Sequence, residues 1–301
     1  MAANLKEVRN RIKSVISTQQ ITKAMKMVSA AKLRKAQQAI IQMRPYSNKL
    51  NAMLSNIMTY SDGEGAAAFG RATEKKKPLI IVITSDRGLC GAFNTNIIKL
   101  VQKTIKEQYS KEAENGSLSM MFIGKKAYEF FRRRYTNCNI IDSKVGLYAD
   151  FKFENVAQLS EALMADFQAG TYDQIEVYYS RFKNAATQFP EREQYLPVAR
   201  SESPAAKPTE TKAAKPDYLF EPKQDILLAE LIPSILQAQL FKCGLDTHAS
   251  EHGSRMTAMD KATENAEGML GELKINYNKA RQEAITKELS EIVAGAAALE
   301  G

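Results

Sequence analysis

Apolar residues recur at alternating steps of three and four in the last quarter of the chain, from about residue 225 onward. The series is Met256, Met259, Thr263, Ala266, Leu270, Leu273, Tyr277, Ala280 and Ala284. This spacing predicts a helix that buries one narrow stripe against another helix. Because no proline follows Pro233, we expect one helix of about 75 residues, roughly 110 Å long.

A second long helix is predicted from about Asn4 to Met58. Its stripe begins with Leu5, Val8, Ile12 and Val15, blurs through Gln19 and Thr22, and resumes as Ala36, Ala39, Met43, Tyr46, Leu50, Met53 and Ile57. Pro45 lies inside this run, and we expect it to bend or break the helix because it removes one backbone hydrogen bond.

The period changes in the middle of the chain, where short apolar, β-branched runs alternate with helical stretches. Strands are expected over 78–84, 118–123, 139–142 and 173–182, with 187–198 as a hairpin partner of the last. Helices are expected over 92–108, 125–134 and 154–168. This alternation predicts a small, mostly parallel, Rossmann-like α/β domain.

The fold class predicted is therefore α/β plus coiled coil. Four segments are expected: a helix over 1–60, the α/β domain over 75–199, a flexible Pro-, Ala- and Lys-rich loop over 200–216, and a foot segment with the C-terminal helix over 217–301. Both long helices join the α/β domain at its base, so they run antiparallel. The second is longer by about 20 residues and should overhang from near Ala280. The overhang is apolar, and we expect another protein to surround it.

Charge is distributed unevenly along the chain, which has a net charge of +8. Residues 1–58 hold eleven Lys and Arg against one acid, Glu7, whereas residues 224–301 hold twelve acids against seven Lys and Arg. The two ends should attract each other, and the N-terminal end keeps positive charge for an acidic partner.

Composition excludes several classes of protein. No apolar run is long enough for a transmembrane helix. The N-terminal residues contain no apolar signal core, so we expect an unexported protein. Cys90, Cys138 and Cys243 are widely separated, which supports neither a zinc site nor a disulfide framework. We expect them to be small buried residues.

Two motifs suggest chemistry. The stretch Ser85–Gly91 follows a strand and precedes a helix, but Gly88 and Gly91 lack the spacing of a phosphate-binding loop. We interpret it as a tight turn. His248-Ala249-Ser250-Glu251-His252 matches an inverted zinc-protease signature. That chemistry needs a closed cavity, and this segment is expected on an elongated helix pair, so we favour exposed or interhelical histidines and expect no metal or other cofactor.

A basic cluster occurs in the first helix: Lys23, Lys26, Lys32, Arg34 and Lys35. A nucleic-acid-binding helix would gather such charges along one stripe, with reading or stacking residues between them. These five point around most of the helix circumference. We therefore favour a solvated helix or acidic protein partners over nucleic acid.

Four motifs, in order, resemble the gamma subunit of bacterial F-type ATP synthase. They are Ile21–Val28 with Ala31–Lys35; Ser85–Asn94; Ser250-Glu251 with Arg255–Met259 and Ala262–Ala266; and Tyr277–Gln282 with Ile285-Thr286, Glu288-Leu289 and Glu291–Val293. The resemblance covers both long helices and the central domain.

The resemblance implies a non-catalytic rotor subunit that holds no nucleotide. It would stand as the central stalk inside a ring of three alpha and three beta subunits, with its foot on the epsilon subunit and the membrane c ring, at the cytoplasmic face of the inner membrane. Beta-subunit contacts are implied for Met25, Lys26, Arg255, Arg281, Gln282, Thr286 and Glu288. Contacts with the ring and epsilon are implied for Tyr218, Phe220 and Glu221.

The implied function is torque transfer. An asymmetric shaft touches each of three surrounding catalytic sites differently, so its rotation changes their affinities in turn. Rotation would couple proton flow through the membrane ring to ATP synthesis and would regulate ATPase activity. Two alternatives stay open: the coiled-coil stalk of another machine, such as a rotary export ATPase, and a nucleotide-binding or zinc enzyme carried on a helical arm.

Overall fold

The computed structural model describes residues 5–60, 77–198 and 224–300. They form two compact units: Lys32–Ser254, which contains the α/β domain, and Met1–Ala31 with Arg255–Gly301, a pair of helices. The two longest helices, α1 (Leu5–Tyr60) and α7 (Gln224–Glu300), contribute residues to both units. α1 passes through Pro45 without ending.

The α/β domain is built on a five-stranded sheet with the order β3-β2-β1-β4-β5. β1 (Pro78–Ile83), β2 (Ser119–Ile123), β3 (Asn139–Ile141) and β4 (Gln174–Phe182) run parallel, and β5 (Gln188–Leu196) is antiparallel to β4. β1 and β2 are buried along their whole length, as expected for strands covered on both faces. The predicted mostly parallel layer is confirmed.

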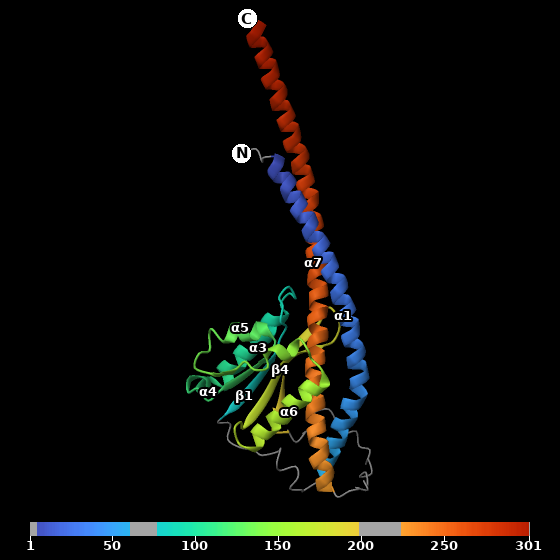
Figure 1. Ribbon diagram of the computed structural model, residues 1–301, viewed down its shortest axis with the longest axis vertical. Coiled ribbons are helices and arrows are strands. Elements are labelled where there is room, and N and C mark those ends of the chain that lie inside the picture. The colour runs from blue at the N-terminus through green and yellow to red at the C-terminus, as the bar shows by residue number, and fades with distance from the viewer. Residues whose placement is uncertain (1–4, 61–76, 199–223, 301) are drawn as a thin grey trace, which may run out of the picture. The chain divides into compact units, whose positions relative to one another are not determined.

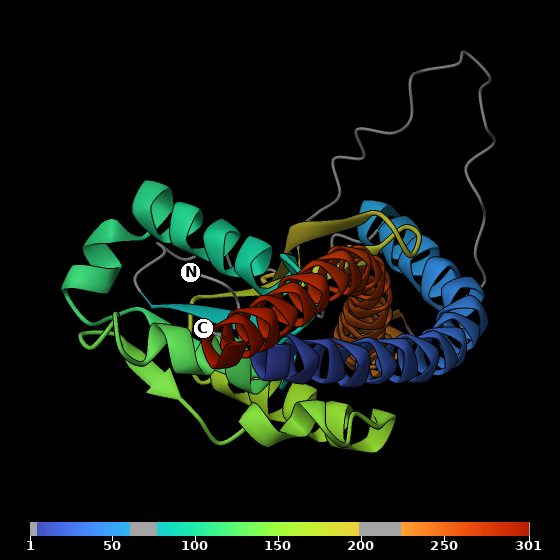
Figure 2. The same cartoon turned by 90° about the horizontal axis from the view of Figure 1, so that it is seen from above.

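Helices cover the two faces of this sheet, as Figure 2 shows. One face packs against α3 (Phe93–Gln108) and α5 (Lys125–Phe131), and α4 (Ser110–Glu114) follows α3. The other face packs against α6 (Phe153–Gln168) and against residues 232–243 of α7. A short 3-10 helix, η1 (Val145–Tyr148), precedes α6. Successive residues of β4 alternate between the two cores, so the predicted common face of Ile175, Val177 and Tyr179 is confirmed.

α7 lies close against the α/β domain because small residues stand on its contact face. A Cβ atom on Gly244 would lie 1.8 Å from the ring of Phe151. Further along the helix, Ser250 donates a hydrogen bond of 2.9 Å to the carbonyl of Ser180 in β4. The same part of α7 also packs on α1, where Leu50 contacts Ile235 and Ala238. Glycine and hydroxyl residues therefore let this helix lie directly on the strands.

The other unit is an antiparallel pair formed by the first part of α1 and the last part of α7 (Figure 1). All nine residues of the predicted α7 stripe are buried or half-buried, whereas the residues between them from 260 to 283 are mostly exposed. The α7 stripe is thus confirmed. Beyond Ala280, the residues up to 296 are exposed except Ala284, which confirms an overhang past the start of α1.

The stripe predicted for α1 needs one correction. Tyr46 was expected on it but is 52% exposed, and Ser47 is buried at 4%. The contact face there runs through Ile40, Met43, Ser47 and Leu50. This register keeps the spacing of three and four, and it places a small hydroxyl rather than a phenol ring at the helix contact.

The remaining elements lie close to their expected bounds. Each predicted strand and helix of the central domain is present, with ends that differ by a few residues. The three cysteines are buried, as predicted, and each has a free thiol in this structure. The domain boundaries proposed from the sequence stay predictions, and the loop over 200–216 lies outside the described residues.

Candidate functional site

The stripe between the helices of the paired unit is partly polar. Its cross-helix pairs include Arg9 with Tyr277, Thr22 with Thr263, and Lys26 with Asp260. The joined atoms lie 3.0, 2.8 and 2.5 Å apart in that order. Residue numbers rise along α1 as they fall along α7, so these contacts fix an antiparallel register. The blurred part of the predicted α1 stripe is therefore a hydroxyl-lined continuation of the same contact, with Thr22 and Ser29 buried.

The residues implied to contact a beta subunit lie in two places. Met25 and Lys26 are half-buried on α1, and Arg255 is buried on α7. Arg281, Gln282, Thr286 and Glu288 are exposed on the overhang. The structure thus gathers four of them on one free helical end. Tyr218, Phe220 and Glu221 lie outside the described residues.

The overhang presents apolar side chains to solvent. Ile285, Leu289, Ile292 and Val293 are 50–70% exposed. The first three are spaced at i, i+4 and i+7, so they form one stripe along a helix face. A stripe of this kind without a covering surface is unfavourable in water, and it marks an interaction site.

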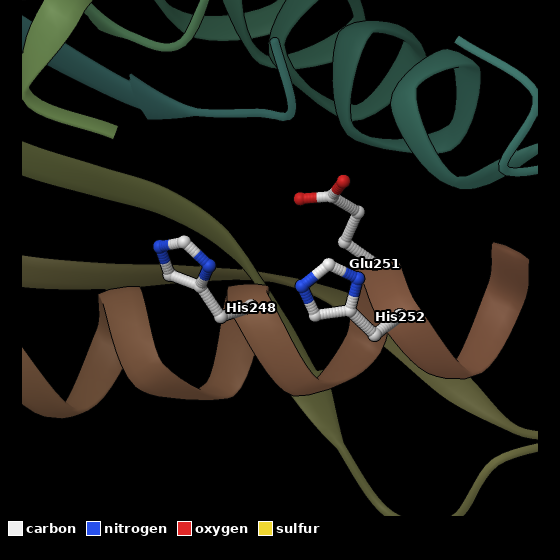
Figure 3. Close-up of side chains that lie close together, drawn as sticks. All are labelled: His248, Glu251 and His252. Atoms are coloured by element: carbon white, nitrogen blue, oxygen red, sulfur yellow. The ribbon is translucent and has the colours of Figure 1, made fainter. Parts of the chain in front are cut away.

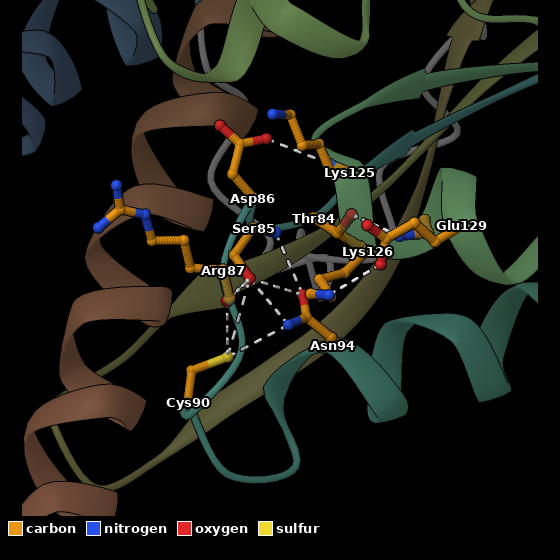
Figure 4. A network of polar contacts seen from close by, with 10 residues as sticks. Thr84, Ser85, Asp86, Arg87, Cys90, Asn94, Lys125, Lys126 and Glu129 are labelled. Atoms are coloured by element: carbon orange, nitrogen blue, oxygen red, sulfur yellow. Dashed lines mark hydrogen bonds and ion pairs between the residues drawn. The ribbon is translucent and has the colours of Figure 1, made fainter.

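The loop after β1 is held by its own side chains (Figure 4). The backbone amide of Ser85 donates to Asn94 Oδ1 at 3.1 Å, and the amide of Lys125 donates to Asp86 Oδ1 at 3.1 Å. The amide of Ala127 donates to Thr84 Oγ1 at 3.1 Å. A phosphate cradle requires such amides to point at the ligand. Here side-chain oxygens take that place.

Backbone geometry agrees with the predicted tight turn. Gly91 has φ 58° and Leu89 has φ 64°, both in the left-handed region. Glycine adopts this conformation at no steric cost. The turn therefore reverses the chain direction between β1 and α3 and, among the described residues, gives no arrangement typical of a nucleotide site.

His248 lies where the sequence did not place it. His248 stacks on Tyr148 of η1, with ring centroids 4.1 Å apart and an interplanar angle of 9°, and Phe151 lies 5.5 Å away. Burial is the main cause that lowers the pKa of His248 below its ordinary value. The expectation of an exposed or interhelical residue is therefore wrong for His248, because this turn of α7 packs on the α/β domain.

Glu251 lies one turn further along the helix with His252 (Figure 3). The Tyr148 hydroxyl donates a hydrogen bond to its buried carboxylate. Ligand atoms of His248, Glu251 and His252 all lie within 4.8 Å of one another. This cluster is the one group of potential metal ligands found among the described residues.

Comparison with known proteins identifies the family. The family model described as ATP synthase matches residues 4–299. The ATP synthase gamma chain of Cytophaga hutchinsonii is 48% identical over 98% of this chain and 99% of its own length. The chain belongs to the ATP synthase gamma-chain family. The gamma chain of Flavobacterium psychrophilum is 48% identical over 99% of this chain and all of its own length, and that of Chlorobium phaeobacteroides is 44% identical over 99% of each.

Solved structures share the gamma-chain fold. A chain of the Euglena gracilis mitochondrial ATP synthase, in a structure of OSCP, F1 and c-ring, has a TM-score of 0.63 at 20% identity, covering 98% of this chain and 94% of its own. A chain of the Tetrahymena thermophila mitochondrial ATP synthase central stalk and c-ring has a TM-score of 0.56 at 22% identity, covering 80% and 99%. Among the described residues, none of the helices has the apolar run needed to cross a lipid bilayer.

Sequence reasoning missed several contacts of this gamma chain. The Thr22–Thr263 hydroxyl pair was not predicted because Thr22, the partner of a residue on the α7 stripe, falls in the blurred part of the α1 stripe. The Lys26–Asp260 ion pair could have been found, since Lys26 and Asp260 are opposite charges on helices expected to run antiparallel. No local signal links Tyr148 to Glu251, which is 103 residues away.

Proposed function

We propose that this chain is the central-stalk rotor subunit of a bacterial F-type ATP synthase. It couples proton flow through the membrane ring to ATP synthesis by turning inside the ring of three alpha and three beta subunits, and it regulates ATPase activity and proton flow. The observation that supports this most strongly is the 48% identity to gamma chains over nearly the whole length of both partners.

The structure supports the proposal through the overhang. The tip of a rotor must be surrounded by a surface against which it can turn. Apolar contacts are not directional, so an apolar stripe suits such a surface better than a set of fixed ion pairs. Ile285, Leu289 and Ile292 form this stripe. Nearby, Arg281, Gln282, Thr286 and Glu288 are exposed, and in this proposal they contact beta-subunit loops.

The helix pair and the foot segment would supply the other contacts. Met25 and Lys26 would pass an acidic loop of beta. Arg255 would contact beta in the same region, because it lies five residues before Asp260, the ion-pair partner of Lys26. Tyr218, Phe220 and Glu221 would meet the epsilon subunit and the c ring. The chain itself makes no bond and holds no nucleotide. It is peripheral, at the cytoplasmic face of the inner membrane, and meets the membrane through the complex.

The mechanism needs asymmetry and stiffness. A ligand or partner shifts a conformational equilibrium only by interacting differently with its states. One shaft within a three-membered ring touches each catalytic site differently, so rotation changes the three affinities in sequence. Bending stiffness would come from the antiparallel helix pair, whose register is held by the cross-helix contacts described above.

The test is assembly and coupled activity. The full chain is co-expressed with alpha and beta subunits from a close relative such as Cytophaga hutchinsonii, and subunit ratio and ATPase rate are measured. We expect a 3:3:1 complex whose ATPase rate changes when the chain ends after Ala280. A chain that never co-purifies with alpha and beta contradicts the rotor proposal.

A matched pair of variants separates the apolar stripe from general disturbance of the overhang. Ile285→Ser with Leu289→Ser and Ile292→Ser removes the stripe. Lys287→Ser with Glu291→Ser removes an exposed ion pair of 3.7 Å on the same helical segment. We expect the first set to change the ATPase rate of the complex and the second to leave it nearly unchanged. Equal effects would mean that the stripe is not the contact surface.

A further inference from the structure

The cluster of His248, Glu251 and His252 takes no part in the proposed rotor contacts. The two histidines stand at i and i+4 and the glutamate at i+3, so all three side chains project from one face of α7. In Figure 3 they lie on the same side of the helix, with the ring of His252 turned toward His248. Their ligand atoms lie within 4.8 Å of one another. Two histidines at i and i+4 on one helix face can bind the same ion.

The surroundings resemble those of a supported ligand set. Tyr148 stacks flat on the ring of His248, which limits its rotation. The hydroxyl of Tyr148 also donates to the Glu251 carboxylate. Ligating carboxylates in proteins are commonly oriented by such a hydrogen bond while the other oxygen binds the ion. One residue of η1 therefore positions two of the three donors.

One polar atom of this cluster is unexplained by the protein alone. His248 Nε2 is buried and has no hydrogen-bond partner within the described residues. Burying a polar ring without full compensation costs stability. Figure 3 places the other ring nitrogen, Nδ1, on the side of His252, so an ion shared with His252 would meet Nδ1, and Nε2 would keep the conformation it has here.

We propose that His248, Glu251 and His252 bind one divalent transition-metal ion, with Zn²⁺ as the reference ion. Two imidazoles and one carboxylate are the donor types that zinc takes, whereas Mg²⁺ and Ca²⁺ prefer oxygen ligands. Ligands of a tetrahedral zinc stand about 3.3 Å apart, given Zn–N bonds of about 2.0 Å. Binding therefore requires the three ligand atoms, which lie within 4.8 Å of one another, to move closer together.

The role of the ion is structural. It closes one turn of α7 and, through Tyr148, fastens that turn to η1. Glu251 already accepts the hydrogen bond from Tyr148, which leaves it poorly placed as the general base that a hydrolytic zinc site needs. The inference concerns the docked part of α7 and does not depend on the proposed rotor function.

Zinc affinity should depend on pH because protons compete for the imidazoles. Burial and the charge of Lys32 lower the pKa of His248, and the carboxylates of Glu251 and Asp86 raise it, with a net lowering. Zinc affinity should therefore fall as the pH is lowered and protons displace the ion from the imidazoles.

The test is zinc titration of the metal-free full chain against a coloured chelator. His248 and His252 are the only histidines in the sequence, so the purification tag must contain none. We expect one zinc per chain. His248→Gln with His252→Gln should lose it, whereas Glu264→Gln with Glu267→Gln, which removes two exposed carboxylates of the same helix, should keep it. Tyr148→Phe should weaken binding by about tenfold, since it removes the bond that orients Glu251.

Two further measurements settle the result. The visible spectrum of bound Co²⁺ distinguishes nitrogen and oxygen ligands from cysteine thiolates, and zinc should raise the unfolding temperature of the wild type but not that of the double histidine variant. Each variant is first checked for native helix content by circular dichroism. Equal zinc binding by wild type and the double variant, a thiolate spectrum, or no binding by the folded wild type would each overturn the proposal.

Discussion

The two compact units of this chain differ in the contacts that stabilise each of them internally. In the α/β unit the buried residues are large and apolar, with Ile80, Ile81, Phe122 and Leu79 fully inaccessible to solvent. In the helix-pair unit the two helices meet along a narrow stripe, and the buried residues of this stripe include Thr22 and Ser29. Apolar burial stabilises roughly in proportion to area. The α/β unit therefore gains more of its stability from apolar burial, whereas the helix pair is specified mainly by the register of its cross-helix contacts.

The largest effect is expected from the buried carboxylate of Glu176 in β4. Its side chain is 1% exposed and accepts hydrogen bonds from Tyr109, Tyr178 and Gln174 at 2.7, 2.8 and 2.6 Å, with Arg192 at 2.5 Å. Glu176→Ala leaves the half-buried guanidinium of Arg192 and two buried phenols without their acceptor. We expect it to lower the free energy of unfolding by about 3–5 kcal/mol, measured by urea denaturation with tyrosine fluorescence, since the chain has no tryptophan.

The control for that change lies on the neighbouring strand. Glu191 also pairs with an arginine, Arg181, at 2.6 Å, but the two side chains are 33% and 51% exposed. Glu191→Ala should cost only about 0–1 kcal/mol because solvent replaces the lost partner. If the two variants lose equal stability, burial is not what makes the Glu176 network important.

The second prediction compares one substitution in both units. Gly244→Ala puts a methyl group 1.8 Å from the Phe151 ring, which is itself stacked on Phe241 at 5.7 Å. Overpacking of this kind costs about 1–3 kcal/mol. Gly268→Ala lies on the same helix with no atom within 4 Å of the added carbon, and alanine favours helix over glycine by about 1 kcal/mol. We expect opposite signs.

Hydrogen exchange followed by mass spectrometry separates these two effects. Gly244→Ala should speed exchange in α7 near residue 244 and in the segment around Phe151, whereas Gly268→Ala should slow exchange in the helix pair. A stabilising Gly244→Ala would mean that the ring of Phe151 moves aside at no cost, and the close contact would then not determine how α7 docks.

The contrast also explains what the sequence could reveal. The central strands and the α7 stripe were predictable because period and residue type agree over many positions, as from Met256 to Tyr277. The α1 stripe was harder to predict. At Tyr46 and Ser47 the residue types favour burial of the tyrosine, but the packing of the facing helix buries the serine instead. The packing of Tyr148 on His248 joins segments 100 residues apart and depends on tertiary structure alone.

The third prediction addresses the register of the helix pair. Thr22 Oγ1 and Thr263 Oγ1 lie 2.8 Å apart, so one hydroxyl donates to the other, and the accepting hydroxyl donates to a carbonyl of its own helix. Thr22→Val alone should cost about 0.5–1.5 kcal/mol because Thr263 loses its partner, whereas the double change to valine should be nearly neutral. A double-mutant cycle measured by thermal unfolding at 222 nm should give a coupling of about 1 kcal/mol. Additive effects would show that the two hydroxyls do not interact.

The smallest effect is expected at the Lys26–Asp260 pair. The two side chains are 41% and 60% exposed, so solvent and salt screen their attraction, and Asp260→Asn should cost no more than about 1 kcal/mol. In the proposed complex, however, the same change releases Lys26 from its partner on α7 and leaves its charge available to an acidic loop of beta. We therefore expect Asp260→Asn to alter the salt dependence of the ATPase rate while hardly changing the unfolding temperature of the free chain. When Lys26→Gln is combined with Asp260→Asn, the charge itself is removed, and the salt dependence of the ATPase rate should no longer show the change caused by Asp260→Asn alone. If both variants behave as wild type in the assembled complex, the ion pair serves only the antiparallel register of the free helix pair.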